Sequence, residues 1–185
     1  MVPSPGAMIV TNNLPETLDA AGLPPYPEMV SRIHRKLSEW SPAIFMGYNS
    51  IRFDEPLMQR AFWQNLLPPY LTVTGGNSRS DVLSLVRVCA KIAAHALKIP
   101  NAASGKPVFK LDRMAPLNGF AHANAHDALG DVEATKHIAK IIQNRVPKLW
   151  AEAISSSDKA FSRKVLDRQE PVLIMDASSA KTVGW

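Results

Sequence analysis

The sequence lacks the features of secreted and membrane-embedded proteins. It holds a single cysteine among 185 residues, Cys89, which excludes an internal disulfide and gives no sign of an oxidising compartment. A run of about 18 apolar residues, which a transmembrane helix needs, is missing as well. The first ten residues carry no basic region and only a short apolar run, so a secretory signal peptide is not expected. These absences predict a cytoplasmic protein with no membrane partner.

The chain also lacks a large excess of positive or negative charge. The net charge is +5, from 21 Lys and Arg against 16 Asp and Glu, and the basic residues are scattered along the chain. This balance suits an anionic partner such as nucleic acid, but a solubilising surface explains it equally well. With 46% hydrophobic and 20% charged residues, the chain has enough apolar material for a core and is not mostly disordered. We therefore expect one globular domain.

Short apolar runs alternate with amphipathic stretches along the chain. Compact apolar runs predict strands at 7–11 and 43–48, and another at 171–176 that has no partner in the remaining sequence. The strand–helix–strand order over the first 146 residues predicts an α/β layer architecture. A loop containing glycine is expected at 70–79 and a polar helical tail at 148–168. Apolar residues at helical spacing predict helices over 27–40, 54–67, 81–97, 110–118 and 127–145.

Two aspartates fall on apolar helix faces. At about 100° per residue, Asp131 lies on the same face as Ile138 and Ile142. An ionised carboxylate there is costly unless it is paired or binds a metal ion, so Asp131 either bonds to nearby backbone or arginine or is a metal ligand. Asp54 has apolar neighbours on its face too. Because it precedes Glu55 and a proline, a helix-capping role is the alternative to a metal-binding role for this residue.

A histidine next to the second aspartate is a candidate catalyst. His126 lies five residues before Asp131, and in a regular helix this spacing would turn the two side chains about 140° apart. The two side chains converge only if His126 lies at the N-terminal end of the helix, where the preceding loop leads into it. His122 lies four residues earlier, but no glutamate follows it in the H-E-x-x-H manner, so a zinc site is not expected.

The residues around these side chains match two motifs of one superfamily. The run Asn49-Ser-Ile-Arg-Phe53-Asp54 fits N-x-x-x-F-D, the second motif of the DEDD exonucleases. The run His126-Asp-Ala-Leu-Gly-Asp131 fits H-x-A-x-x-D, the third motif of their histidine-bearing branch. The stretches GYNSIRFDEP, NSRSDVLSLVRVC and HANAHDALGDVEAT further resemble the exonuclease I family, bacterial enzymes that degrade single-stranded DNA from the 3′ end.

The resemblance runs from about Pro5 to Pro147. It implies a ribonuclease H-like fold, in which a mixed sheet is flanked by helices. It also implies an exonuclease domain at 1–146 that is incomplete at its N-terminus, followed at 147–185 by the beginning of an SH3-like β domain.

The resemblance further implies a mechanism and its residues. Asp54 and Asp131 match metal-binding carboxylates, and His126 matches the general base that activates water for phosphodiester hydrolysis, releasing 5′-mononucleotides in DNA repair and recombination. The complete enzyme would use two Mg²⁺ ions, with Mn²⁺ as the alternative metal. It would bind single-stranded DNA and meet single-strand DNA-binding protein. The expected substrate-binding residues, for which surface or packing roles stay open, are Lys110, Phe53, Asn49 and Arg79.

The sequence departs from the superfamily at its first motif. The D-x-E run that should precede the strand at 7–11 has no match there. The single D-x-E in the chain, Asp131-Val-Glu133, belongs to the third motif, and Glu133 falls on the opposite helix face. We therefore expect the chain to lack two acidic ligands and to be inactive as written. The alternatives are a catalytically silent nucleic-acid-binding protein and a metal-dependent hydrolase of other substrates.

Overall fold

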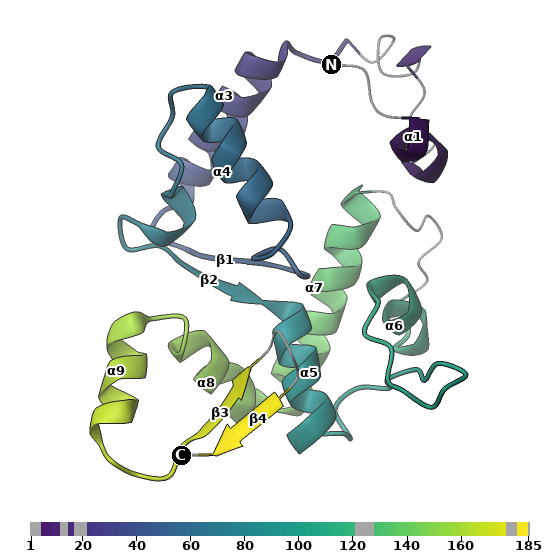
Figure 1. Ribbon diagram of the computed structural model, residues 1–185, viewed down its shortest axis with the longest axis vertical. Helices are drawn as coiled ribbons and strands as arrows, with labels where there is room; N and C mark the ends of the chain where they lie inside the picture. The colour runs from purple at the N-terminus through teal and green to yellow at the C-terminus, as the bar shows by residue number, and fades with distance from the viewer. Residues whose placement is uncertain (1–4, 12–14, 17–21, 121–127, 177–180, 185) are drawn as a thin grey trace.

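A parallel pair of strands lies at the centre of the fold. The computed structural model describes residues 5–11, 15–16, 22–120, 128–176 and 181–184. Strand β1 (Ile44–Gly47) pairs in parallel with β2 (Ser78–Asp81), with Ile44 opposite Ser78 and Gly47 opposite Asp81. Figure 1 shows α3 (Tyr26–Glu39) and α4 (Asp54–Gln64) on one side of this pair, while α5 (Val82–Ile92) continues from β2 and α7 (Ala128–Arg145) passes beside the strands. The predicted α/β architecture is confirmed.

Shorter elements complete the described chain. Helix α6 lies beside α7, and α8 also packs against α7 (Figure 1). Within the described residues, no helix combines the length and apolarity that crossing a membrane requires. The bounds of these elements are α1 Pro5–Thr11, η1 Leu71–Val73, α6 Leu111–Leu117, α8 Pro147–Ser155, α9 Lys159–Asp167, β3 Leu173–Asp176 and β4 Lys181–Gly184.

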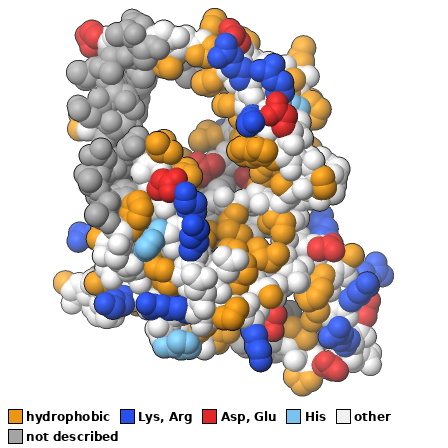
Figure 2. All heavy atoms as spheres, turned by 180° about the vertical axis from the view of Figure 1, so that it is seen from behind, with side chains coloured by type: hydrophobic (Ala, Val, Ile, Leu, Met, Phe, Trp, Pro, Cys, Tyr) orange, Lys and Arg blue, Asp and Glu red, His pale blue; other side chains and the backbone are white. Residues whose placement is uncertain are grey.

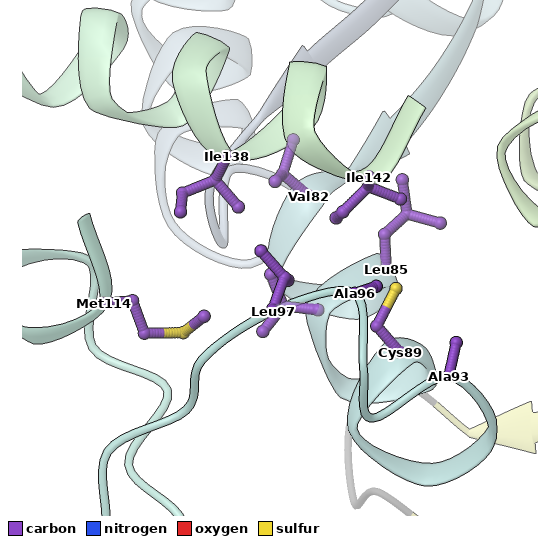
Figure 3. Packing of buried hydrophobic residues seen from close by; sticks show 10 residues of the cluster. Val82, Leu85, Cys89, Ala93, Ala96, Leu97, Met114, Ile138 and Ile142 are labelled. Atoms are coloured by element: carbon purple, nitrogen blue, oxygen red, sulfur yellow. The ribbon is translucent and has the colours of Figure 1, made fainter. Parts of the chain in front are cut away.

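The main core forms where α5, α6 and α7 meet. Figure 3 shows Ile138 and Ile142 of α7 near Val82 of α5, with Met114 of α6 at the other side of the cluster. All four side chains are fully buried. Leu149, Trp150 and Ala153 of α8 pack against the same cluster. This core fixes α7, and with it Asp131 in its first turn, relative to β2 and α5.

A smaller apolar contact holds α3 against α4. Val30 of α3 and Phe62 of α4 are both buried, and the ring of His34 meets the Phe62 ring edge-on, with 4.9 Å between ring centroids. This contact anchors the C-terminal half of α4. Asp54 is the first residue of the same helix, at its other end.

One prediction for the N-terminal half is wrong, and another is right in part. The strand expected at 7–11 is the helix α1, and its residue Ile9 is exposed instead of buried. A helix satisfies its backbone hydrogen bonds internally, whereas a strand needs a neighbour, and Pro5 has the backbone geometry of a first helical residue. Part of the loop expected at 70–79 belongs to β2, whose polar residues gave no strand pattern. This strand is defined by its pairing with β1, which begins where the Ser78 N–H donates to the Ala43 carbonyl.

The C-terminal strand prediction is half right. A strand forms at β3, but it is not unpaired, since β4 pairs with it in antiparallel register from Leu173 opposite Gly184 to Asp176 opposite Lys181. The polar tail at 148–168 is helical but divides into α8 and α9. The Asp158 side chain caps α9 by accepting from the Ala160 N–H. Within the described residues, the central sheet is a purely parallel pair, not the mixed sheet that was expected.

The predicted helices are confirmed, with differences at their ends. Helix α5 ends at Ile92, five residues before the predicted end. The chain leaves helical geometry at Ala93, so that Ala96 and Leu97 turn into the core, and Arg145 donates to the Ala96 carbonyl at 3.2 Å. Tertiary contacts therefore replace the helical hydrogen bonds of this last turn.

Candidate active site

The two motif aspartates line one cavity of about 750 Å³. One wall comes from the end of β1 and the turn that leads into α4, and it carries Asp54. The other comes from the first three turns of α7, and it carries Asp131. The remaining lining residues are Met46, Gly47, Tyr48, Ser50, Phe53, Val82, Leu111, Ala128, Val132, Thr135, Lys136 and Ala139. The fold thus brings together two carboxylates that the sequence places on separate helices.

Asp54 does not cap its helix. It is the first residue of α4, and the N-cap position is taken by Phe53, which makes no side-chain capping hydrogen bond. The capping alternative for Asp54 is therefore wrong. Partial burial raises the pKa of the Asp54 carboxyl above its ordinary value, and the carboxylates of Asp81 and Glu55 add to this effect. A cation in the cavity would oppose this shift, because positive charge stabilises the ionised carboxylate.

Asp131 lies on the buried side of α7. Its neighbours on the helix, Ala134, Ile138 and Ile142, are fully buried, and Asp131 itself is half-buried. Its backbone carbonyl accepts from the Thr135 hydroxyl at 2.8 Å. The helical-wheel prediction that placed this carboxylate on the core-facing side is confirmed.

A second cavity of about 360 Å³ adjoins the first and shares Asp131 with it. Lys110 and Asn49 line it, together with Asp112. The structure thus places two of the predicted substrate-binding residues beside Asp131. Phe53, the third, lies at the larger cavity and is 64% exposed.

Arg79 lines neither of these two cavities. Its Nη1 lies 2.6 Å from Oε2 of Glu55, and the same oxygen accepts from the Thr72 hydroxyl at 3.4 Å. Glu55 is only 4% exposed, whereas Arg79 is half-buried, so the acidic end of this ion pair is the buried one. No pattern in the sequence indicates this ion pair, because two adjacent acidic residues are ordinary in a first helical turn.

Asp81 is another buried carboxylate that sequence reasoning missed. At 6% exposure, it accepts backbone hydrogen bonds from Asn49 at 2.8 Å, Ile51 at 3.4 Å and Leu83 at 3.0 Å. The last of these bonds caps α5. The other two hold the turn before Asp54, in which Asn49 adopts the left-handed conformation with φ of 60°.

Gly47 is required where β1 enters this turn. A Cβ at this position would lie 2.6 Å from Cβ of Ser50 and 2.8 Å from its Oγ. We expect Gly47→Ala to destabilise the protein by about 1–3 kcal/mol, as overpacking does. Urea unfolding would measure the loss. Adding Ser50→Gly removes both clashing atoms, so the double variant should recover most of it, and a double variant as unstable as Gly47→Ala would contradict this explanation.

Of the three predicted catalytic residues, the described residues include Asp54 and Asp131. His126 lies outside the described residues, so its predicted place at the mouth of α7 stays a prediction. Among the described residues, no group of three or more His, Cys, Asp or Glu side chains is placed to hold a metal ion. Two carboxylates at one cavity fit a hard, oxygen-preferring cation such as Mg²⁺, which keeps water in the rest of its shell.

Comparison with known proteins agrees with the motif resemblance, although no family model matches the chain. Exodeoxyribonuclease I of Haemophilus influenzae is 34% identical over 167 residues, which are 90% of this chain and 35% of that protein. The E. coli exonuclease I structure with a dA16 oligonucleotide superposes with a TM-score of 0.85 at 28% identity, covering 100% of this chain and 40% of the other. A complex of exonuclease I with SSB-Ct gives 0.83 at 26% identity, with the same coverage of this chain and 41% of the other.

The predicted resemblance is thereby confirmed. The chain is similar in sequence and in fold to exodeoxyribonuclease I over most of its own length, and it spans about a third of the length of the curated relatives it matches.

Proposed function

We propose that this chain carries part of the active site of a 3′–5′ exodeoxyribonuclease that hydrolyses single-stranded DNA to 5′-mononucleotides. One observation carries the proposal: Asp54 and Asp131, the acidic residues of two separate motifs, line one cavity in a fold similar to exodeoxyribonuclease I. The oligonucleotide in the similar E. coli structure supports single-stranded DNA as the substrate. The proposal includes a ribonuclease H-like fold, a cytoplasmic location and a role in DNA repair and recombination.

In this proposal Asp54 and Asp131 hold divalent metal, Mg²⁺ or Mn²⁺. When bound, two such ions stabilise the charge that develops on the phosphate and on the leaving 3′-oxygen. His126 accepts the proton from the attacking water, a transfer for which an imidazole is suited near neutral pH. The water oxygen forms the new bond to phosphorus, and the bond from phosphorus to the 3′-oxygen breaks.

The substrate would lie along the two cavities. Lys110 offers a positive charge for a phosphate close to Asp131, and Asn49 lies beside it. The exposed Phe53 ring is available for stacking on a base. Arg79 stays a predicted contact to the strand, although Glu55 already pairs with its guanidinium. The similar complex with SSB-Ct supports a contact between the complete enzyme and single-strand DNA-binding protein.

A nuclease assay tests the proposal directly. We expect the 185-residue chain to degrade 5′-labelled single-stranded DNA slowly or not at all in Mg²⁺, because two carboxylates leave most of the metal shell to water. A version extended at its N-terminus by a strand with the D-x-E motif should gain activity that a chelator removes.

The matched control is Asp54→Asn in the extended version, which should be inactive. Full, chelator-sensitive activity of the 185-residue chain would mean that other ligands complete the site. Binding without activity in both versions would favour the silent nucleic-acid-binding alternative.

Binding of single-stranded DNA should be weak and depend on salt. Figure 2 shows the face of the molecule opposite to the one in Figure 1. The Lys and Arg side chains form several separate groups on it, not one stripe, so few phosphates should be neutralised at once. The logarithm of the binding constant should fall against the logarithm of salt concentration with a slope of about −0.7 per phosphate contacted. Fluorescence anisotropy would measure this slope. Lys110→Ala should make this slope less steep by about 0.7. An affinity independent of salt would contradict an electrostatic groove.

A further inference from the structure

Strand β2 carries two charged side chains that both contact the segment around Asp54. Arg79 and Asp81 are two positions apart, so they project from the same face of the strand. In the parallel register they lie opposite Phe45 and Gly47 of β1. Because the carboxyl ends of parallel strands meet at one edge, the end of β2 lies beside the turn that leaves β1 and enters α4.

Arg79 makes the contact on the C-terminal side of Asp54. Its guanidinium pairs with Glu55, the next residue, through a distance of 2.6 Å. The Glu55 carboxylate is almost fully buried and also accepts from Thr72. Pulling Glu55 away would leave a buried charge without its partner, which is costly, so the pair fixes the first turn of α4.

Asp81 makes the contact on the N-terminal side of Asp54. Its two carboxylate oxygens accept from the backbone N–H groups of Asn49 and Ile51. An ionised acceptor strengthens such bonds, and burial at 6% exposure shields them from water. The bonds hold Asn49 in a left-handed conformation that its side chain tolerates but does not require.

We propose that Arg79 and Asp81 are positioning residues that clamp the 49–55 segment on both sides of Asp54. The clamp holds the Asp54 carboxylate at the cavity, facing α7 and Asp131. This inference rests on the proposed function, in which Asp54 is a metal ligand. It assigns Arg79 a role through Glu55 and Asp54 in addition to the predicted contact to DNA.

Two measurements on the 185-residue chain test the clamp. The first is amide hydrogen exchange, which reports local opening of the 49–55 segment. The second is titration with Mn²⁺ alone, followed by paramagnetic broadening of the amide signals of Asp54 and Asp131. Both are made at a temperature at which every variant is fully folded.

Arg79→Met and Asp81→Asn each remove one arm of the clamp. In both, exchange over 49–55 should rise about tenfold, as expected for loss of one charged hydrogen bond, while exchange in the core of α7 stays unchanged. The Mn²⁺ dissociation constant should rise by a similar factor. Arg79→Lys keeps a cation beside Glu55 and should restore both values toward wild type.

Ile138→Val is the matched control. It loosens the core without touching the clamp, so it should lower the melting temperature and leave the Mn²⁺ dissociation constant unchanged. If it weakened Mn²⁺ binding as much as Arg79→Met does, the effect of Arg79 would be general destabilisation, and the inference would fail.

The remaining outcomes separate the clamp from the proposed function. Unchanged exchange over 49–55 in Arg79→Met and Asp81→Asn would overturn the clamp. Faster exchange with unaltered Mn²⁺ affinity would also overturn it, because the contacts would then hold the turn without placing the ligand. If the wild-type chain and Asp54→Asn gave the same Mn²⁺ titration, the proposed metal site would fail, and the exchange data would still decide the clamp.

Discussion

Replacing His126 with alanine is expected to lower turnover about 10²–10⁴-fold in an active form of the enzyme that contains the D-x-E strand, with little change in DNA affinity. The reason is that the imidazole accepts a proton only as the attacking water reacts, so its removal raises the barrier without removing a ground-state contact. Single-turnover degradation of 5′-labelled single-stranded DNA would measure the rate, and anisotropy in Ca²⁺ would measure binding.

A comparison with Asp131→Asn separates a general base from a metal ligand. This second variant should weaken metal binding and the rate together. If His126→Ala left the rate unchanged, the role assigned to this histidine would be wrong, and the motif resemblance would have misled on this residue.

Replacing Ile138 with alanine is expected to destabilise the chain by about 2–5 kcal/mol, the usual cost of an isoleucine truncated in a packed core. Ile138 is fully buried at the junction of α5, α6 and α7, and Figure 3 shows it among Val82, Leu97 and Met114. The neighbouring helices are fixed by other contacts as well, so the cavity left by the truncated side chain cannot close completely. Urea unfolding followed by circular dichroism would measure the change.

Lys140→Ala is the control for this experiment. It lies two residues further along α7 on the exposed side, so its effect should stay within about 0.5 kcal/mol. A loss under about 1 kcal/mol for Ile138→Ala would mean that the core repacks around the gap, and that α7 is held to β2 less rigidly than the cavity geometry implies.

Local patterns in the sequence determined the helices. Apolar spacing located α3, α4, α5, α6 and α7, because a helix makes its backbone hydrogen bonds within one segment and shows its buried face as a period of 3.6. The same spacing placed Asp131 on the core side of its helix, and the motifs around Asp54 and Asp131 predicted that the two carboxylates act together.

Strands and the partners of buried charges depended on the tertiary structure. The polar run at β2 is a strand only because β1 lies beside it, and 7–11 is a helix that makes its own hydrogen bonds. Likewise, β3 has a partner in β4 that local composition did not reveal. A strand leaves its backbone groups to be satisfied by another segment, so its sequence alone does not fix its state.

The sequence by itself determined which residues are chemically suited to the site, because residue type and motif spacing are local properties. Only the tertiary structure decided how the site is held. Glu55 and Asp81 look like ordinary acidic residues in the sequence, and each gains its role from partners 24 and 32 residues away, Arg79 and Asn49. The energy of a buried charge depends on what surrounds it in space, and that neighbourhood exists only after β1, β2 and α4 have come together.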